Sequence, residues 1–279
     1  MKYAICNEMY GDLPFAEVFA HAAQLGYQGI EIAPFTLVAD PTQDPTAVDG
    51  KTIEQIRDLA QQHQLEIVGL HWLLAKTNEL HLTTADDATR RRTADYLIRL
   101  VELCSRLGGS LMVFGSPQQR NLEAGLSAEQ GMANACEVFQ AVVPALEQHQ
   151  VTLALEPLGP KEGNFLLTAD DTVELIQRIG SPSVALHLDV KAMSSESMPI
   201  PEIIKKHHDN LHHFHANDPN LLGPGMGDVD FLPIFKALAD VDYKGWVSVE
   251  VFDFSPGVDR LAQDSIQYMK SVTDQLTDT

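Results

Sequence analysis

Residues 151–156 read VTLALE, a stretch whose side chains divide between two faces of a single strand. Its odd-numbered positions carry Val and Leu, whereas its even-numbered positions carry Thr, Ala and finally Glu156. Neighbouring side chains of a strand point to opposite sides. The apolar side must therefore meet a layer of helices, and Glu156 must point the other way at the end of the strand. Seven further runs of this kind decide the fold.

The eight strand candidates are spread along the whole chain. They are YAIC (3–6), QGIEIA (28–33), EIVGLHW (66–72), SLMVFG (110–115), VTLALE (151–156), SVALHLD (183–189), LHHFHA (211–216) and WVSVEVF (246–252). Helices are predicted between them, beginning near Pro14, Asp49, Ala85, Ser127, Thr168, Pro199 and Asp228, with a last one after Ser255. Ser127 and Thr168 each precede acidic or amide residues, as the capping residue of a helix does. Strands that alternate with helices, without a hairpin signal, indicate a parallel sheet.

The number of strands and the length of the chain together predict a closed barrel. Eight parallel strands form a (β/α)8 or TIM barrel, which takes about 250 residues in one domain. No linker rich in Pro, Gly or Ser divides the 279 residues, so we expect residues 1–279 to form a single domain. The alternative is a doubly wound open sheet. That fold usually has a glycine-rich phosphate loop after its first strand, and CNEMYGD (6–12) does not provide one.

The composition excludes several classes of partner. A formal net charge of −20 opposes binding to nucleic acid and to anionic membranes. The one basic run, Arg90 to Arg92, is expected on a solvated helix face. No segment approaches the roughly 20 apolar residues of a membrane helix, and the first residues lack the apolar core of a signal peptide. Three widely spaced cysteines without a CxxC motif indicate reduced thiols, so we expect a cytoplasmic protein.

Four consecutive strands end in residues that could bind a metal. The inward positions at these ends are Glu156, Asp189, His215 and Glu250, separated by 33, 26 and 35 residues, or about one strand–helix unit each. Each residue alone could cap a helix or form a salt bridge, but carboxylates that converge without a cation repel one another strongly. One imidazole with three carboxylates suits Mn²⁺, Mg²⁺, Co²⁺ or Zn²⁺, and the absence of thiolates opposes a structural zinc.

The histidine-rich stretch LHHFHANDPN (211–220) is not a metal site by itself. Alternation along the strand sends His212 outward to the helices and leaves His213 below the rim of the barrel. Only His215 stands at the level of the three carboxylates. A glycine-rich segment, GPGMGD (223–228), follows this strand and suits either a flexible lid, which we prefer, or a phosphate loop.

With these features the sequence resembles the xylose-isomerase-like TIM-barrel superfamily, and specifically its sugar (phosphate) isomerase/epimerase branch. That branch includes ketose 3-epimerases, hydroxypyruvate isomerase and inosose-processing enzymes and, more distantly, endonuclease IV. The resemblance covers essentially the whole chain. It is carried most specifically by LEPLGPKEGNFLLT (155–168), HLDV (187–190), HFHANDPN (213–220), GPGMGDVDF (223–231) and WVSVEVFD (246–253).

The resemblance implies a role for each residue of the predicted centre. Glu156, Asp189, His215 and Glu250 match the metal ligands of the family, and we expect Mn²⁺ first, with Mg²⁺, Co²⁺ or Zn²⁺ as alternatives. Glu156 and Glu250 match the acid/base pair of the epimerases. Glu162, six residues after the first ligand, matches a residue that contacts a substrate hydroxyl. The implied activity is isomerisation or epimerisation of a sugar or sugar phosphate through an enediolate.

Other activities and the state of assembly remain open. A lyase or dehydratase acting on a keto-sugar or keto-glycoside would use the same centre, and a sugar-binding barrel without catalysis is a third possibility. An activity like that of endonuclease IV needs three zinc ions and a basic groove, which the net charge of −20 opposes. Barrels of the family are commonly dimers or tetramers, so a homo-oligomer is expected.

Two positions depart from the ketose 3-epimerases. Those enzymes carry a His three residues after the Asp ligand and an Arg six residues after the His ligand, where this chain has Ala192 and Leu221. The resemblance therefore does not extend to keto-hexose 3-epimerase specificity. His71 and His187, both on inward faces, could supply replacement contacts to a substrate. His187 lies one layer below the rim, so a buried structural role is equally open.

Four further polar residues lie close to the predicted centre. Arg120 either clamps a substrate oxygen or phosphate or is a surface loop residue. Lys191 lies beside an expected ligand and could contact substrate. Asp218 either orients His215 or binds substrate, and Glu31, inward on the second strand, either supports a ligand or forms a buried ion pair.

Overall fold

Eight parallel strands close into a barrel in chain order in the computed structural model, which describes residues 1–40 and 43–277. The strands are β1 (Lys2–Cys6), β2 (Gly29–Ile32), β3 (Glu66–Leu70), β4 (Leu111–Phe114), β5 (Thr152–Leu155), β6 (Val184–Asp189), β7 (Leu211–Ala216) and β8 (Trp246–Val249). Because β8 pairs with β1, the open-sheet alternative is excluded and the predicted TIM barrel is confirmed.

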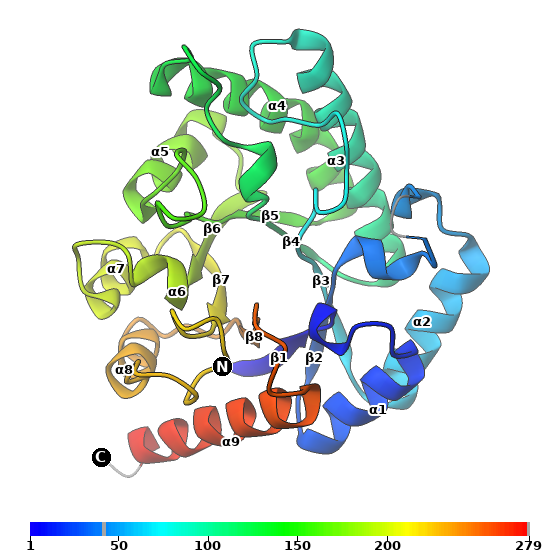
Figure 1. The fold of residues 1–279 in the computed structure, drawn as a ribbon, viewed down its shortest axis with the longest axis vertical. Helices are drawn as coiled ribbons and strands as arrows, with labels where there is room; N and C mark the ends of the chain where they lie inside the picture. Colours follow the sequence, from blue (N-terminus) through cyan, green and yellow to red (C-terminus); the bar gives the residue numbers. More distant parts are fainter. Residues whose placement is uncertain (41–42, 278–279) are drawn as a thin grey trace.

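Helices surround the barrel on the outside (Figure 1). They are α1 (Phe15–Leu25), α2 (Gly50–Gln62), α3 (Asp87–Leu107), α4 (Ala128–His149), α5 (Ala169–Ile179), α6 (Val190–Met193), α7 (Ile200–His207), α8 (Leu232–Asp240) and α9 (Val258–Thr277). The expected caps form, since Ser127 and Thr168 accept hydrogen bonds from the backbone amides of Gln130 and Asp171. Helix α8 begins four residues later than the expected start near Asp228. Among the described residues, no helix is long and apolar enough to cross a membrane.

Most of the apolar core lies between the strands and the helices. Outward side chains of the strands, such as Ile5, Leu70, Phe114, Leu186 and Phe214, are almost completely buried there. A much smaller apolar cluster is separate from this layer and consists of Ala4, Val68, Leu111, Val113 and Ala154. The remaining inward positions toward the C-terminal strand ends are polar. That is the end at which TIM barrels carry their chemistry.

The register of β6 and β7 sets two predicted ligands side by side. Leu186 pairs with Leu211, but the next pair is His187 with His213, so β7 holds one extra residue at His212. Such a bulge shifts every later residue of the strand by one position. As a result Asp189 lies directly opposite His215 on the neighbouring strand.

Strand β3 approaches β4 so closely that a side chain is excluded at one position. A Cβ atom added to Gly69 would lie 1.8 Å from the carbonyl oxygen of Leu111. Gly69 pairs with Glu31 of β2, where the register also shifts by one residue. Because Gly69 has no side chain, β3 can lie this close to β4 at the position where it also pairs with Glu31 of β2.

Candidate metal centre

The four residues at the ends of β5 to β8 meet at one buried point. Ligand atoms of Asp189, His215 and Glu250 all lie within 4.8 Å of one another, and an oxygen of Glu156 lies within the same distance of Asp189. All four residues are at most 6% exposed. Gly115 makes room for Glu156, because a Cβ at that position would lie 2.2 Å from Oε2 of the glutamate.

Asp189 is fixed by two hydrogen bonds before any ion is considered. Its Oδ1 accepts from the backbone amide of Ala192 at 2.8 Å, which caps the short helix α6. Its Oδ2 accepts from Nδ2 of Asn217 at 2.5 Å. Asn217 in turn accepts from the backbone amide of Lys191 at 2.9 Å. The sequence analysis named Asp218 and missed its neighbour Asn217. The position of Asn217, directly after the strand that carries His215, was the signal that could have indicated its role.

Glu250 is held from two sides. Nε1 of Trp72 donates to Oε1 at 2.7 Å, and Nδ1 of His215 lies 3.1 Å from Oε2. Trp72 has a positive φ of 51°, a backbone conformation that is rare for a bulky side chain and costs on the order of 1–3 kcal/mol. Sequence reasoning missed Trp72, because nothing in the alternation of the strand indicates that the chain turns in this way after His71.

The second nitrogen of His215 faces another carboxylate. Nε2 of His215 lies 3.2 Å from Oε2 of Glu31, whose Oε1 lies 2.6 Å from Nε2 of His213. A carboxylate that holds the far nitrogen of an imidazole fixes the orientation and tautomer of a metal ligand. Glu31 is thus placed to support His215. It also contacts His213, so the buried ion pair that the sequence left as the alternative is present as well.

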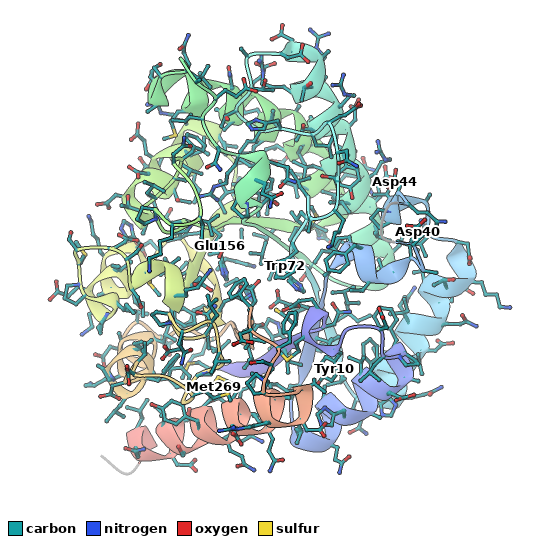
Figure 2. The ribbon with its side chains drawn as sticks, in the orientation of Figure 1. Tyr10, Asp40, Asp44, Trp72, Glu156 and Met269 are labelled. Atoms are coloured by element: carbon teal, nitrogen blue, oxygen red, sulfur yellow. The ribbon has the colours of Figure 1, made fainter. Side chains whose placement is uncertain are left out.

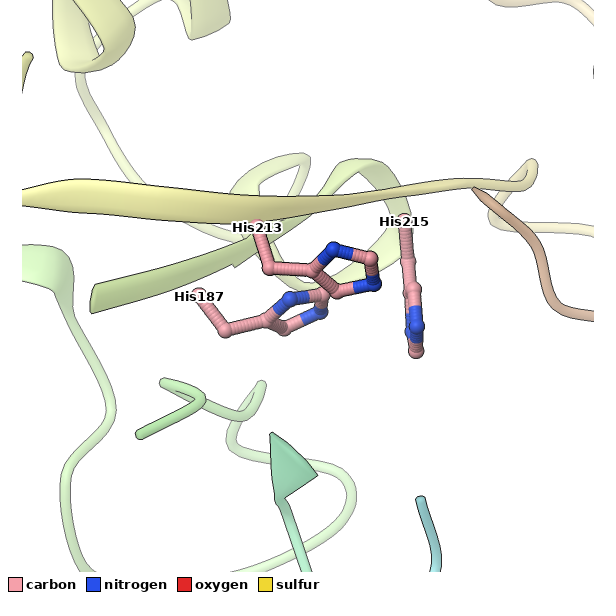
Figure 3. A group of neighbouring side chains, drawn as sticks. All are labelled: His187, His213 and His215. Atoms are coloured by element: carbon pink, nitrogen blue, oxygen red, sulfur yellow. The ribbon is translucent and has the colours of Figure 1, made fainter. Parts of the chain in front are cut away.

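Three histidines lie close together in the barrel, as Figure 3 shows. The ring of His187 is 4.2 Å from that of His215 and 5.2 Å from that of His213, centroid to centroid. Both ring nitrogens of His187 lack a hydrogen-bond partner among the described residues. His71 is also fully buried, with Nε2 2.6 Å from Oε2 of Glu8. Neither His71 nor His187 lines the cavity at the centre. This placement favours the buried alternative for His187, and one of its ring nitrogens lies within 4.8 Å of carboxylate oxygens of Glu156 and Asp189.

Arg120 holds two backbone segments together by hydrogen bonds, which we call its brace role. Its three nitrogen atoms donate five hydrogen bonds of 2.6–3.2 Å to the carbonyl oxygens of Gly115, Glu156, Phe165 and Leu166. A guanidinium has five N–H groups, so none is left for a substrate, and the side chain is 1% exposed. The expectation of a substrate clamp or a surface residue was therefore wrong. Arg120 ties the loop after β5 to the end of β4.

Asp218 stabilises the loop that follows β7 by hydrogen bonds to the backbone of that loop. Its Oδ2 accepts from the backbone amide of Val229 at 3.0 Å and its Oδ1 from that of Asn220 at 3.3 Å. These bonds correct the expectation that Asp218 orients His215 or binds substrate. The glycine-rich segment packs on neighbouring side chains, since a Cβ at Gly225 would lie 2.4 Å from the ring of Tyr268 in α9. This packing does not suit a flexible lid.

Lys191 and Glu162 form an ion pair at the side of the centre. Nζ of Lys191 lies 2.6 Å from Oε1 of Glu162 and 3.9 Å from the ring centroid of Phe252. Burial alone lowers the pKa of Lys191, but the carboxylates of Asp189 and Glu162 outweigh it and raise the pKa. The ammonium group therefore stays charged beside the carboxylates.

The electrostatics of the centre fit a divalent cation. Burial, and then repulsion from Glu250 and Asp189, raise the pKa of Glu156 well above its usual range. Burial opposes the charged form of His215, but Glu250 and Glu31 outweigh it and raise the pKa of the imidazole well above its ordinary value. Three carboxylates and one imidazole nitrogen that converge in this way match the donors that Mn²⁺ and similar ions accept.

A cavity of about 530 Å³ opens from these residues to the surface. Glu156, Glu162 and Glu250 line it, together with the stacked rings of Trp72 and Phe252. Glu156, which follows β5, and Trp72, which follows β3, both lie toward the middle of the molecule in Figure 2. A substrate in this cavity would touch both catalytic candidates at once.

The raised pKa values predict how metal affinity depends on pH. Ligands must lose their protons before an ion binds, and His215 keeps its proton above the ordinary histidine pKa of about 6.5. Affinity for Mn²⁺, measured by calorimetry, should therefore keep rising as the pH increases from about 6 to about 8. Asp189→Asn should abolish binding, whereas the exposed control Asp58→Asn should not. An affinity that is constant over this range would contradict the assignment.

The brace role of Arg120 predicts a loss of stability. Arg120→Met removes five hydrogen bonds to buried carbonyl groups, of which only that of Leu166 keeps a further donor, the backbone amide of Leu158, so the free energy of unfolding in urea should fall by at least about 3 kcal/mol. Arg91, whose side chain is 75% exposed, provides the control. Arg91→Met should change stability by no more than about 0.5 kcal/mol. A stable Arg120→Met variant that loses only substrate binding would restore the clamp hypothesis.

Comparisons with known proteins agree with the barrel fold. The probable ketose 3-epimerase of Synechocystis sp. is 26% identical over 91% of this chain and 89% of its own length. The fructoselysine 3-epimerase of Shigella flexneri is 25% identical over 86% of each chain. The structure of D-psicose 3-epimerase from Clostridium cellulolyticum H10 with D-tagatose matches 98% of this chain and 99% of its own, with 21% identity and a TM-score of 0.84. The model of one family, described as xylose isomerase-like TIM barrel, matches residues 19–272. The chain belongs to the xylose isomerase-like TIM barrel family.

Proposed function

We propose that this chain is a divalent-metal-dependent isomerase or epimerase that acts on a sugar or sugar phosphate through an enediolate. Its relatives are ketose and sugar epimerases and hydroxypyruvate isomerase, and the chain is an enzyme of this isomerase/epimerase type. One observation carries the proposal. Glu156 and Glu250 enter the same cavity from β5 and β8, with Asp189 and His215 on the strands between them.

Glu156, Asp189, His215 and Glu250 would hold the ion, and Mn²⁺ is our first candidate, with Mg²⁺, Co²⁺ and Zn²⁺ as alternatives. When bound, a divalent cation polarises a carbonyl and its neighbouring hydroxyl, which acidifies the C–H bond between them and stabilises the enediolate. The protein supplies the orientation of the ligands. Trp72 and Asn217 hold Glu250 and Asp189 by direct hydrogen bonds.

The two glutamates differ in the ease with which they ionise. The pKa of Glu156 is raised well above its usual range by burial and by nearby carboxylates. Burial opposes ionisation of Glu250 as well, but His215 beside it outweighs burial and lowers the pKa. Carboxyl groups whose pKa values are pushed apart suit opposite roles in proton transfer. We assign the two glutamates to the two proton transfers: one accepts the substrate proton and the other returns one, on the opposite face or on the neighbouring carbon.

The residues around the glutamates would position the sugar. Glu162 lines the cavity and offers a carboxylate to a hydroxyl group, while its partner Lys191 places a positive charge next to it. Trp72 and Phe252 stack at 6.0 Å with an angle of 15° between their planes. This pair presents an apolar wall to the carbon side of a sugar and excludes water from the reacting atoms.

Solvent deuterium provides the test of this mechanism. The wild type with Mn²⁺ in D₂O should incorporate deuterium into a turned-over ketose, keto-acid or keto-glycoside from a panel of such substrates. Glu156→Gln and Glu250→Gln should each lower turnover by about 10²–10⁴-fold. The control Glu102→Gln, exposed on α3, should retain full activity.

The other outcomes of this experiment are equally informative. If both glutamine variants keep full activity with metal bound, the assignment of the acid/base pair is wrong. Loss of a β-substituent from the substrate, in place of reprotonation, would identify a lyase or dehydratase. Bound metal without deuterium exchange on any member of the panel would identify a sugar-binding protein without catalysis.

A further inference from the structure

A second group of potential metal ligands lies beside the candidate centre. Sγ of Cys6, a carboxylate oxygen of Glu8 and a ring nitrogen of His71 all lie within 4.8 Å of one another, and each residue is at most 5% exposed. We call these three residues the Cys6 cluster. They come from the ends of β1 and β3, whereas the four residues assigned to the first ion come from the ends of β5 to β8.

The backbone holds the Cys6 cluster in place. Cys6 is the last residue of β1, and Glu8 begins a single 3-10 turn directly after it. Asn7 lies between them and is bound twice to the neighbouring chain. Its backbone amide donates to the carbonyl oxygen of Glu31 at 3.0 Å, and its Oδ1 accepts from the backbone amide of Ala33 at 2.8 Å. The thiol and the carboxylate are therefore positioned by hydrogen bonds that do not involve an ion.

The Cys6 cluster contains polar atoms that nothing in the protein satisfies. Oε1 of Glu8 and Nδ1 of His71 are buried without a hydrogen-bond partner in the described part of the chain. The thiol of Cys6 makes one weak contact, 3.9 Å from Nε2 of His215. A buried polar atom without a partner costs about 1–3 kcal/mol, and in a native protein it points to strain, a water or an ion. Two such atoms in one cluster indicate that the cluster is completed by a ligand.

An ion pair within the Cys6 cluster is the simplest alternative. Nε2 of His71 lies 2.6 Å from Oε2 of Glu8, so one proton between them satisfies these two atoms. The pair leaves the other carboxylate oxygen, the other ring nitrogen and the thiol unused. It also does not account for a cysteine in the same group. A cation bound by all three residues accounts for the whole cluster.

The ligand types distinguish this cluster from the first centre. A thiolate, an imidazole and a carboxylate suit Zn²⁺, whereas Mn²⁺ and Mg²⁺ favour oxygen ligands. Ligand atoms at 2.0–2.3 Å from a tetrahedral zinc lie roughly 3.3–3.6 Å apart. Because the three atoms already lie within 4.8 Å of one another, the cluster needs to contract by roughly 1.5 Å at most. Three protein ligands leave the fourth position of the ion for water, as in catalytic zinc sites.

We propose that Cys6, Glu8 and His71 form a second metal site, which binds Zn²⁺. Binding releases the thiol proton and the proton that lies between Glu8 and His71. The two ions are neighbours, since the rings of His71 and His215 lie 6.5 Å apart, centroid to centroid. The inference does not depend on the proposed isomerase/epimerase function, because it concerns the binding of metal alone.

Cobalt provides the probe, because Co²⁺ replaces Zn²⁺ and gives a charge-transfer absorption in the near ultraviolet when a thiolate binds it. The wild type, with its first centre already filled with Mn²⁺, should show this thiolate band when Co²⁺ is added, and Zn²⁺ should then remove the band. Cys6→Ser should lose the band, whereas the control Cys136→Ser, in α4, should keep it. His71→Gln, a second variant in case Cys6→Ser does not fold, should weaken Co²⁺ binding at this site at least about tenfold.

Asp189→Asn separates the two sites. This variant lacks a ligand of the first ion, so it should keep the thiolate band although it no longer binds Mn²⁺. The absence of a thiolate band in the wild type, or a band that survives in Cys6→Ser, would overturn the proposal. A band that persists in His71→Gln but disappears in Glu31→Gln would also overturn it, because Cys6 would then belong to a site with Glu31 and His215.

Discussion

The structure depends on the confinement of three carboxylates and one imidazole at the C-terminal end of a closed barrel. Asp189, His215 and Glu250 bring their ligand atoms within 4.8 Å of one another, and Glu156 joins them through Asp189. Mutual repulsion and the loss of water make this arrangement costly for ionised groups. The raised pKa of Glu156 is the expression of that cost, whereas the pKa of His215 is raised because Glu250 and Glu31 stabilise its charged form. A divalent cation removes it, and the same cation would supply the chemistry that the two glutamates need.

A second layer of residues keeps the four side chains in place. Glu31 holds the far nitrogen of His215, Asn217 holds Asp189, and Trp72 holds Glu250. Arg120 acts one step further out, because it fixes the backbone carbonyl of Glu156 and the loop that follows. Preorganisation of this kind explains why so many buried polar groups occur in the upper half of a barrel whose outer layer is apolar.

Alternation along the strands predicted the fold and the four candidate ligands, because a parallel barrel places all the strand ends on one face. The period of two residues assigns Glu156, His215 and Glu250 to the interior without knowledge of any contact. Residues outside the strands could not be predicted in this way. The role of Trp72 depends on its left-handed backbone conformation, with φ at 51°. The role of Arg120 depends mainly on carbonyl groups between Glu156 and Leu166, which lie 36 to 46 positions later in the chain. Asp218 was misassigned because its partners, the amides of its own loop, leave no pattern in the sequence.

Location of the metal in a crystal of the Mn²⁺-loaded protein, from anomalous scattering near the manganese absorption edge, tests the central claim most directly. We expect one strong peak, about 2.0–2.4 Å from Nδ1 of His215 and from carboxylate oxygens of Glu156, Asp189 and Glu250. A peak among His187, His213 and Glu31 deeper in the barrel, or no peak at any site with manganese in excess, would contradict it.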